Sequence, residues 1–179
     1  MGKRFDAINK ISRISNEILG HLTNSKENLS IVYRPSLGAP IQKMPSESEF
    51  LTALEEARTA DLRRGMTTLG PHREDLGILV NEIDMGPFSS RGQARTLALS
   101  MKLAEAKVLE DLRGYPPLVL LDDVLSELDE QRRDMVLNQT LKSGQTLITS
   151  TDLDSFDQDF MSQSNVFTIN QGVIQELIP

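Results

Sequence analysis

The segment "PPLVLLDDVLSELDE", Pro116 to Glu130, decides the fold class of this chain. Four consecutive apolar residues, Leu118 to Leu121, predict a strand that is buried on both faces, as in a parallel sheet. The strand then ends in two adjacent carboxylates, Asp122 and Asp123. Like charges repel each other, and a buried carboxylate is costly without a partner. The pattern therefore predicts that a cation or a reacting phosphate lies at the end of this strand.

A long helix is predicted just before the strand. It would begin at a cap formed by Ser89 or Ser90 and end at Gly114. Its apolar stripe recurs at helical spacing, at Leu97, Met101, Ala104, Val108 and Leu112.

The segments after the strand predict a helix, another strand, a helix and a closing hairpin. The helix would begin near Asp129. The segment "QTLITS" (145–150) predicts the next core strand. The closing hairpin, "VFTINQGVIQEL", would turn at Asn170–Gly172. This order of helices and strands predicts an α/β layer with parallel core strands.

The first half of the chain also alternates between helices and strands. It predicts, in order, an amphipathic helix over 4–23, a strand over Leu29–Arg34, a proline-rich loop over 35–45, a helix from the capping box of Ser46 and Glu49 to about Arg64, and a hairpin around Asn81.

Bulk composition narrows the functional classes. The chain has 179 residues, no cysteine and a formal net charge of −7. There is thus no disulfide framework or cysteine metal site, and the acidic balance is unfavourable for a stand-alone nucleic-acid binder. Neither a membrane span nor the apolar core of a signal peptide is evident, so a cytoplasmic protein with no membrane partner is expected.

The strand-end acids suit nucleotide chemistry. Ligands of such sheets bind beyond the carboxyl ends of the strands, where Asp122 and Asp123 lie together with Thr149, Ser150 and Thr151. One acid would hold Mg²⁺ and the other would polarise an attacking water. The alternative is that both acids merely cap the next turn.

The segment "SSRGQ", Ser89 to Gln93, opens the long helix and suits an anion, because helix N-termini carry free N–H groups. Gly92 would let a phosphate approach the backbone closely. Taken alone, an ordinary serine N-cap is the better interpretation.

Together, the order and spacing of "SSRGQ", "LLDD", "SELD" and "TST" resemble the ABC-type ATPase head of the RecF family. Three stretches resemble RecF more than a transporter ATPase, and SMC-type heads are more distant: "GPHREDL" (70–76), "RTLALSMKLAEA" (95–106) and "LLDDVLSELDEQRR" (120–133). The resemblance covers residues 60–179 well and the first 60 weakly. It implies that 1–65 are a remnant of an inserted helical lobe with a connecting strand, and that 66–179 are the C-terminal half of the head.

The resemblance implies a role for "SSRGQ". Ser90, Arg91, Gly92 and Gln93 match the signature motif, which contacts the γ-phosphate of ATP held by the other subunit of a dimer. Arg91 stands where transporter heads have glycine, and RecF tolerates a longer side chain there.

It also implies roles for residues after the apolar strand. Asp122 matches the Walker B acid that serves Mg²⁺, and Asp123 matches the catalytic acid, which is glutamate in most ABC proteins. Ser126 and Asp129 match the D-loop, which crosses the dimer interface. Thr151 falls at the switch position.

One motif is absent from the sequence: no G-x-x-x-x-G-K-[ST] P-loop occurs. We therefore expect a C-terminal part of a RecF protein that is inactive alone as an ATPase. The family resemblance implies ATP and Mg²⁺ as cofactors, ATP-dependent homodimerisation with weak hydrolysis, and binding to single-stranded, gapped or junction DNA. It further implies promotion of RecA loading with RecR and RecO.

Two other hypotheses stay open. The chain could be a non-catalytic interaction fragment, or Asp122, Asp123, Asp152 and Asp154 could form a Toprim-like phosphodiesterase site. His72 is expected to make a structural hydrogen bond, and Arg73 a surface ion pair with Glu74 or Asp75.

Overall fold

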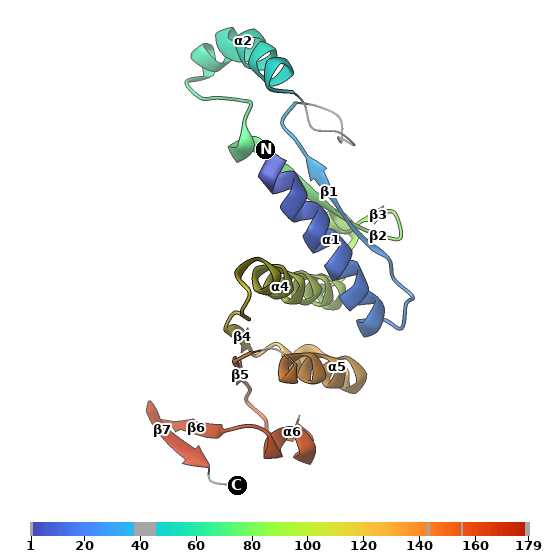
Figure 1. The fold of residues 1–179 in the computed structure, drawn as a ribbon, viewed down its shortest axis with the longest axis vertical. Helices are drawn as coiled ribbons and strands as arrows, with labels where there is room; N and C mark the ends of the chain where they lie inside the picture. Colours follow the sequence, from blue (N-terminus) through green and yellow to red (C-terminus); the bar gives the residue numbers. More distant parts are fainter. Residues whose placement is uncertain (1, 38–45, 143, 155, 178–179) are drawn as a thin grey trace. The chain divides into compact units, whose positions relative to one another are not determined.

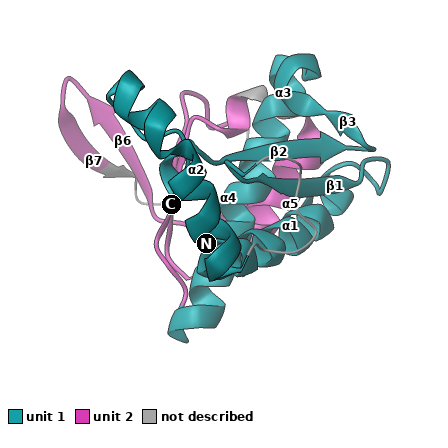
Figure 2. Cartoon of the chain, turned by 90° about the horizontal axis from the view of Figure 1, so that it is seen from above, with its two compact units in different colours: residues 1–115 teal, residues 116–179 magenta. Residues whose placement is uncertain are grey.

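The computed structural model describes residues 2–37, 46–142, 144–154 and 156–177 (Figure 1). The chain forms two compact units, residues 1–115 and residues 116–179 (Figure 2). The predicted loop over 35–45 lies mostly outside the described residues. No helix within the described ranges combines the length and the apolar character that a bilayer span requires.

The first unit combines helices with a three-stranded antiparallel sheet in the order β1-β2-β3. Its elements are α1 (Gly2–Leu22), β1 (Leu29–Arg34), α2 (Glu47–Arg64), the 3-10 helix η1 (Pro71–Arg73), β2 (Asp75–Val80), β3 (Ile83–Asp84), α3 (Met85–Phe88) and α4 (Arg91–Arg113). These bounds confirm the predicted helices and the predicted hairpin, in which Asn81 and Glu82 form the turn with positive φ.

Helix α1 holds the unit together because it packs against both β1 and α4 (Figure 1). Toward the sheet, Ile8 joins Ile31 and Tyr33 in one apolar cluster, and toward α4, Ile14 joins Ala104 and Val108 in another. The helix also covers the outer edge of β1, which would otherwise expose unpaired N–H groups. Two polar side chains of α1 accept hydrogen bonds from these N–H groups. Asn16 accepts from the Leu29 N–H at 2.7 Å, and Ser12 accepts from the Ile31 N–H at 2.9 Å.

The predicted apolar stripe of α4 is confirmed over most of its length but is wrong at its end. Leu97, Met101, Ala104 and Val108 all belong to the apolar clusters of the unit. Leu112 is 67% exposed instead. The packed part of α4 ends at Val108, so the next turn extends past its partners.

The second unit contains the predicted α/β segment. Its elements are β4 (Val119–Asp122), the 3-10 helix η2 (Leu125–Glu127), α5 (Glu130–Leu141), β5 (Thr146–Thr149), α6 (Gln158–Ser162), β6 (Val166–Asn170) and β7 (Val173–Leu177). Strands β4 and β5 pair in parallel, and β6 and β7 form an antiparallel hairpin. The hairpin turns through Gln171 and Gly172, both with positive φ, as a type I′ turn requires.

The prediction that β4 is buried on both faces is wrong. Leu121 is 5% exposed, but Leu120 is 67% exposed and Leu118 is 53% exposed. The reason is that β4 and β5 form a sheet of only two strands among the described residues. One face of this small sheet, carrying Leu120 and its β5 neighbour Leu147, therefore stays open to solvent.

The predicted division at residue 65 separates a remnant of an inserted lobe from the C-terminal half of an ATPase head. It stays a prediction. By packing, the chain divides between Tyr115 and Pro116 instead. The long helix α4 thus belongs to the same unit as α1, although the sequence grouped it with the strands that follow.

Candidate functional site

The two strand-end acids lie where the parallel sheet stops. Asp122 is the last residue of β4, and its register partner is Thr149, the last residue of β5. The Thr149 hydroxyl donates to Asp122 Oδ1 at 2.6 Å and accepts from the Asp123 N–H at 3.0 Å. One hydroxyl therefore links the ends of both strands to both acids.

Asp123 adopts the left-handed conformation, with φ of 49°. Few non-glycine residues occupy this region, and aspartate does so more readily than most. The conformation is held from both sides, because Thr149 accepts from the Asp123 N–H and the Ser126 hydroxyl donates to the Asp123 carbonyl at 2.9 Å. The chain thereby turns sharply out of β4 at the second acid.

Of the predicted residues in this unit, the structure brings Asp122, Asp123 and Ser126 together. Asp129 serves the next helix instead: it N-caps α5, accepts from the Arg132 N–H at 2.9 Å and pairs with the Arg132 guanidinium at 3.5 Å. Thr151 lies two residues beyond β5 and is exposed.

The predicted signature residues open α4 in the other unit. Ser90 is the N-cap; its hydroxyl accepts from the Gln93 N–H at 3.2 Å, and Gln93 Oε1 accepts from the Ser90 N–H at 3.0 Å. Arg91 and Gly92 follow the cap and are exposed. A Cβ added at Gly92 would meet no atom within 4 Å, so a ligand can approach the backbone there.

The residues at the end of β4 fit a magnesium ion. Magnesium is usually bound through one or two carboxylates together with waters and substrate phosphates. Asp122 is exposed, and its Oδ1 accepts from Thr149 while its Oδ2 has no hydrogen-bond partner among the described residues. No group of three or more acidic or histidine side chains in the described ranges could hold a metal ion by itself.

The four-acid site of the phosphodiesterase hypothesis is not formed among the described residues. Asp152 and Asp154 belong to a local turn after β5. There, Asp152 Oδ1 accepts from the Asp154 N–H at 2.9 Å, and Ser150 donates to the Asp152 carbonyl at 2.8 Å.

The "GPHRED" segment is built into the first unit by hydrogen bonds. His72 bonds the Thr67 hydroxyl at 2.9 Å, as expected of a structural histidine, and Arg73 Nε donates to the Thr67 carbonyl at 3.0 Å. The ion pair expected for Arg73 is replaced: buried Glu74 pairs with Arg4 at 2.8 Å and accepts from Tyr33. Burial raises the pKa of the Tyr33 phenol, and the Glu74 carboxylate raises it further.

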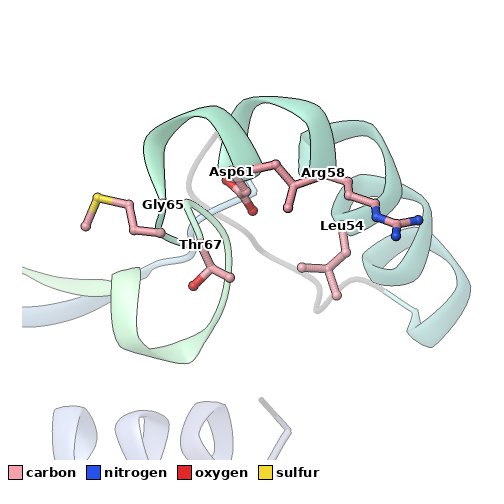
Figure 3. Close-up of a pocket in the computed structure, with 7 residues that line it drawn as sticks. Leu54, Arg58, Asp61, Gly65 and Thr67 are labelled. Atoms are coloured by element: carbon pink, nitrogen blue, oxygen red, sulfur yellow. The ribbon is translucent and has the colours of Figure 1, made fainter.

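A shallow pocket lies beside α2 and contains none of the predicted site residues (Figure 3). Leu54, Arg58 and Asp61 contribute to its lining from the helix, and Thr67 from the segment that follows. The Asp61 carboxylate accepts from both the N–H and the hydroxyl of Thr68, at 2.9 and 2.7 Å. This acid therefore has a structural role in the turn after α2.

Several curated proteins similar to this chain share one description. The "DNA replication and repair protein RecF" of Halalkalibacterium halodurans is 37% identical over 176 residues, which are 97% of this chain and 47% of that protein. The protein of the same description from Staphylococcus carnosus is 37% identical over 179 residues, with 96% and 47% covered. This chain is a homologue of RecF. It spans about half the length of the curated relatives it matches, and a C-terminal part of RecF fits the match. No family model matches the chain.

Solved structures agree with this relationship. A structure of "the recombination mediator protein RecF-ATP in RecFOR pathway" has a TM-score of 0.80 and 34% identity, and the match covers 99% of this chain and 46% of RecF. An SMC head bound to the C-winged helix domain of ScpA has a TM-score of 0.53 at 15% identity, which shows a shared fold alone. The fold is therefore part of an ABC-type ATPase head, as predicted.

The sequence placed Thr149 at the same sheet edge as Asp122 and Asp123, but its hydrogen bonds to the two acids were not predicted. The signal that could have found them is register: two parallel strands that end together place their last residues side by side. A hydroxyl at the end of β5 was thus the nearest partner for an acid at the end of β4.

Proposed function

We propose that this chain provides the signature and Walker B elements of a RecF-type ATPase head. The observation that carries the proposal is the strand-end arrangement of Asp122 and Asp123, held by Thr149 and Ser126, in a chain homologous to RecF. The RecF structures that resemble the chain are described as RecF with ATP and in the RecFOR pathway, which supports a nucleotide site.

Each proposed site residue has a distinct task. Asp122 offers a carboxylate oxygen to Mg²⁺, which, when bound, neutralises charge on the phosphates of ATP. Asp123 orients the attacking water and accepts its proton, and its short side chain makes hydrolysis slow because positioning dominates this chemistry. Ser90, Arg91, Gly92 and Gln93 contact the γ-phosphate bound to the opposing subunit, while Ser126 and Asp129 border that interface and Thr151 occupies the switch position.

The P-loop that cradles the phosphates must come from elsewhere, because the sequence of this chain has none. In the proposed function, a P-loop-bearing half completes the head, and ATP then drives dimerisation. The completed protein acts in the cytoplasm on single-stranded, gapped or junction DNA, and promotes RecA loading with RecR and RecO. The open face of β4 and β5, with Leu120 and Leu147, supports a need for such completion.

The test is ATP hydrolysis by a mixture of this chain and the P-loop-bearing N-terminal half of a RecF relative. We expect only the mixture, and neither part by itself, to release phosphate. Asp123→Asn should lower the rate of release roughly 10²-fold or more, because the general base is removed. Lys142→Ala, at the exposed C-cap of α5, is the control and should leave turnover unchanged. Equal turnover in wild type and Asp123→Asn would refute the assignment.

A further inference from the structure

We propose that Thr149 is the positioning residue of the strand-end acids. Its hydroxyl fixes the Asp122 carboxylate and the Asp123 backbone in the arrangement that accepts a divalent cation. This inference rests on the proposed function and deepens it, because it names the group that orients the Mg²⁺ carboxylate.

The bonding capacity of a single hydroxyl explains the arrangement. A threonine hydroxyl has one donor and two acceptor positions. At Thr149 the donor goes to Asp122 Oδ1 at 2.6 Å, and one acceptor position receives the Asp123 N–H at 3.0 Å. The short first distance is typical of a hydrogen bond to a charged carboxylate, which is stronger than one between neutral groups.

The backbone holds this hydroxyl in a fixed position. Thr149 ends β5 directly beside Asp122 in the parallel register, so no flexible loop separates the two residues. A β-branched side chain is also restricted at χ1, which reduces the ways in which the hydroxyl can turn away. With Oδ1 engaged, rotation of the carboxylate is limited, and Oδ2 is the oxygen left for a cation.

The same hydroxyl determines how the chain leaves the strand. Asp123 must enter the left-handed region, with φ of 49°, before the chain continues into η2. Without the Thr149 hydroxyl, the Asp123 N–H would lose its acceptor, and the turn would then depend on the Ser126 bond to the Asp123 carbonyl. Thr149 therefore positions the first acid through its side chain and the second through its backbone.

The same strand offers a matched control. Thr146 begins β5, and its Oγ1 is buried without a hydrogen-bond partner among the described residues. Thr146→Val and Thr149→Val make the same chemical change three residues apart. Only the second removes hydrogen bonds to the strand-end acids.

The experiment is a Mn²⁺ titration of the full chain labelled with ¹⁵N, mixed with ATP and the unlabelled P-loop-bearing half of a RecF relative. Paramagnetic broadening of the backbone amides of the labelled chain is the readout. We expect localised broadening at Asp122, Asp123 and Thr149 in the wild type, and the same affinity in Thr146→Val. Thr149→Ser keeps the hydroxyl but loses the χ1 restriction, so its affinity should lie between those of the wild type and Thr149→Val. In Thr149→Val the apparent affinity should fall roughly fivefold, as expected for the loss of a hydrogen bond. Hydrogen exchange of the Asp123 amide should accelerate in Thr149→Val alone.

The two readouts separate the two claims. If the wild type binds Mn²⁺ at these residues and Thr149→Val binds equally well with an unchanged Asp123 amide, the positioning role is overturned and the proposed metal site stands. If no localised broadening occurs in the wild type, the Asp122 metal assignment is refuted. Faster exchange of the Asp123 amide in Thr149→Val would then still support the hydrogen-bonded link itself.

Discussion

At the scale of single residues, the backbone of Asp123 makes this strand end unusual. The residue stands directly after a strand with φ of 49°, a region that costs most side chains roughly 1–2 kcal/mol. Aspartate tolerates the region better than glutamate, because its short polar group bonds locally. The catalytic acid expected here is glutamate in most ABC proteins, so the local backbone offers a physical reason for the shorter residue.

This conformation predicts opposite effects of two substitutions on stability. Asp123→Gly should preserve or increase the free energy of unfolding, by up to about 1 kcal/mol, because glycine enters the left-handed region without strain. Asp123→Val should lower it by roughly 1–2 kcal/mol, because a β-branched residue is strained there. Urea unfolding followed by circular dichroism measures both. A valine variant as stable as the glycine variant would contradict the observed backbone conformation.

A second prediction at this scale concerns Arg34 and Asp84, which pair across the sheet. The hydrogen bond from Arg34 holds the pKa of Asp84 below its ordinary value of 3.8. The folded state therefore binds this proton less readily than the unfolded state. The resulting stabilisation is complete above the ordinary pKa and is lost as the pH falls through the lower, folded-state value.

Urea unfolding of wild type and Asp84→Asn at a series of pH values tests this. Asparagine keeps an oxygen to cap the Gly86 N–H, which now bonds Asp84 at 2.9 Å. We expect the wild type to be the more stable protein at pH 6, and the difference to shrink below about pH 4. A difference that does not change with pH would show that the ion pair is not formed in solution. Gly77→Ala should also remove the pH dependence, because a Cβ there would lie 2.8 Å from Arg34 Nε and would displace the Arg34 side chain from Asp84.

Local sequence patterns predicted the strand-end acids Asp122 and Asp123, the Ser90 cap and Gly92 at the start of α4. The Thr149 link could not be assigned so directly, because it joins residues 27 positions apart and depends on strand register. The partners of Glu74 were also missed: Arg4 is 70 positions away, and no local rule brings the two together.

At the scale of elements, two helices begin in the same way. Ser46 and Glu49 form a capping box on α2, and Ser90 and Gln93 form one on α4. The two boxes are chemically alike, but only the second coincides with the proposed signature motif. They therefore allow the structural role of a cap to be separated from a nucleotide-contacting role.

Ser90→Ala and Ser46→Ala should each lower the free energy of unfolding by about 1 kcal/mol, the usual effect of losing an N-cap. With the P-loop half added, only Ser90→Ala should also reduce ATP-dependent dimerisation, measured by sedimentation velocity. The matched serine on α2 corrects for loss of stability. Equal dimerisation by the two variants would remove Ser90 from the proposed interface with ATP.

Sequence periodicity predicted the helices and strands well because each reflects local propensity, capping or turn chemistry. The strand β1 and both hairpin turns illustrate this. Burial was predicted less well, since it depends on what lies opposite. The apolar run of β4 is typical of a strand covered on both sides, yet Leu120 is exposed because no described element covers that face.

At the scale of the whole molecule, that uncovered face predicts self-association. Leu120 and Leu147 on the two-stranded sheet, and Leu118 just before β4, expose apolar surface where another chain can bind. We expect Leu120→Gln to weaken concentration-dependent association in analytical ultracentrifugation. Leu112→Gln is the control, because Leu112 is equally exposed, at 67%, but lies on α4. A wild-type chain that stays monomeric at every concentration would contradict this expectation.

If this chain is the P-loop-lacking part of a RecF-type head, it should need a P-loop-bearing half to bind ATP tightly. Fluorescent ATP with Mg²⁺ should be titrated with this chain alone, then with the P-loop-bearing half of a RecF relative alone, and finally with both. The two parts together should bind ATP more tightly than either part alone, and Asp122→Asn should weaken this gain. Tight binding of ATP by this chain alone, or no gain on mixing, would contradict this assignment.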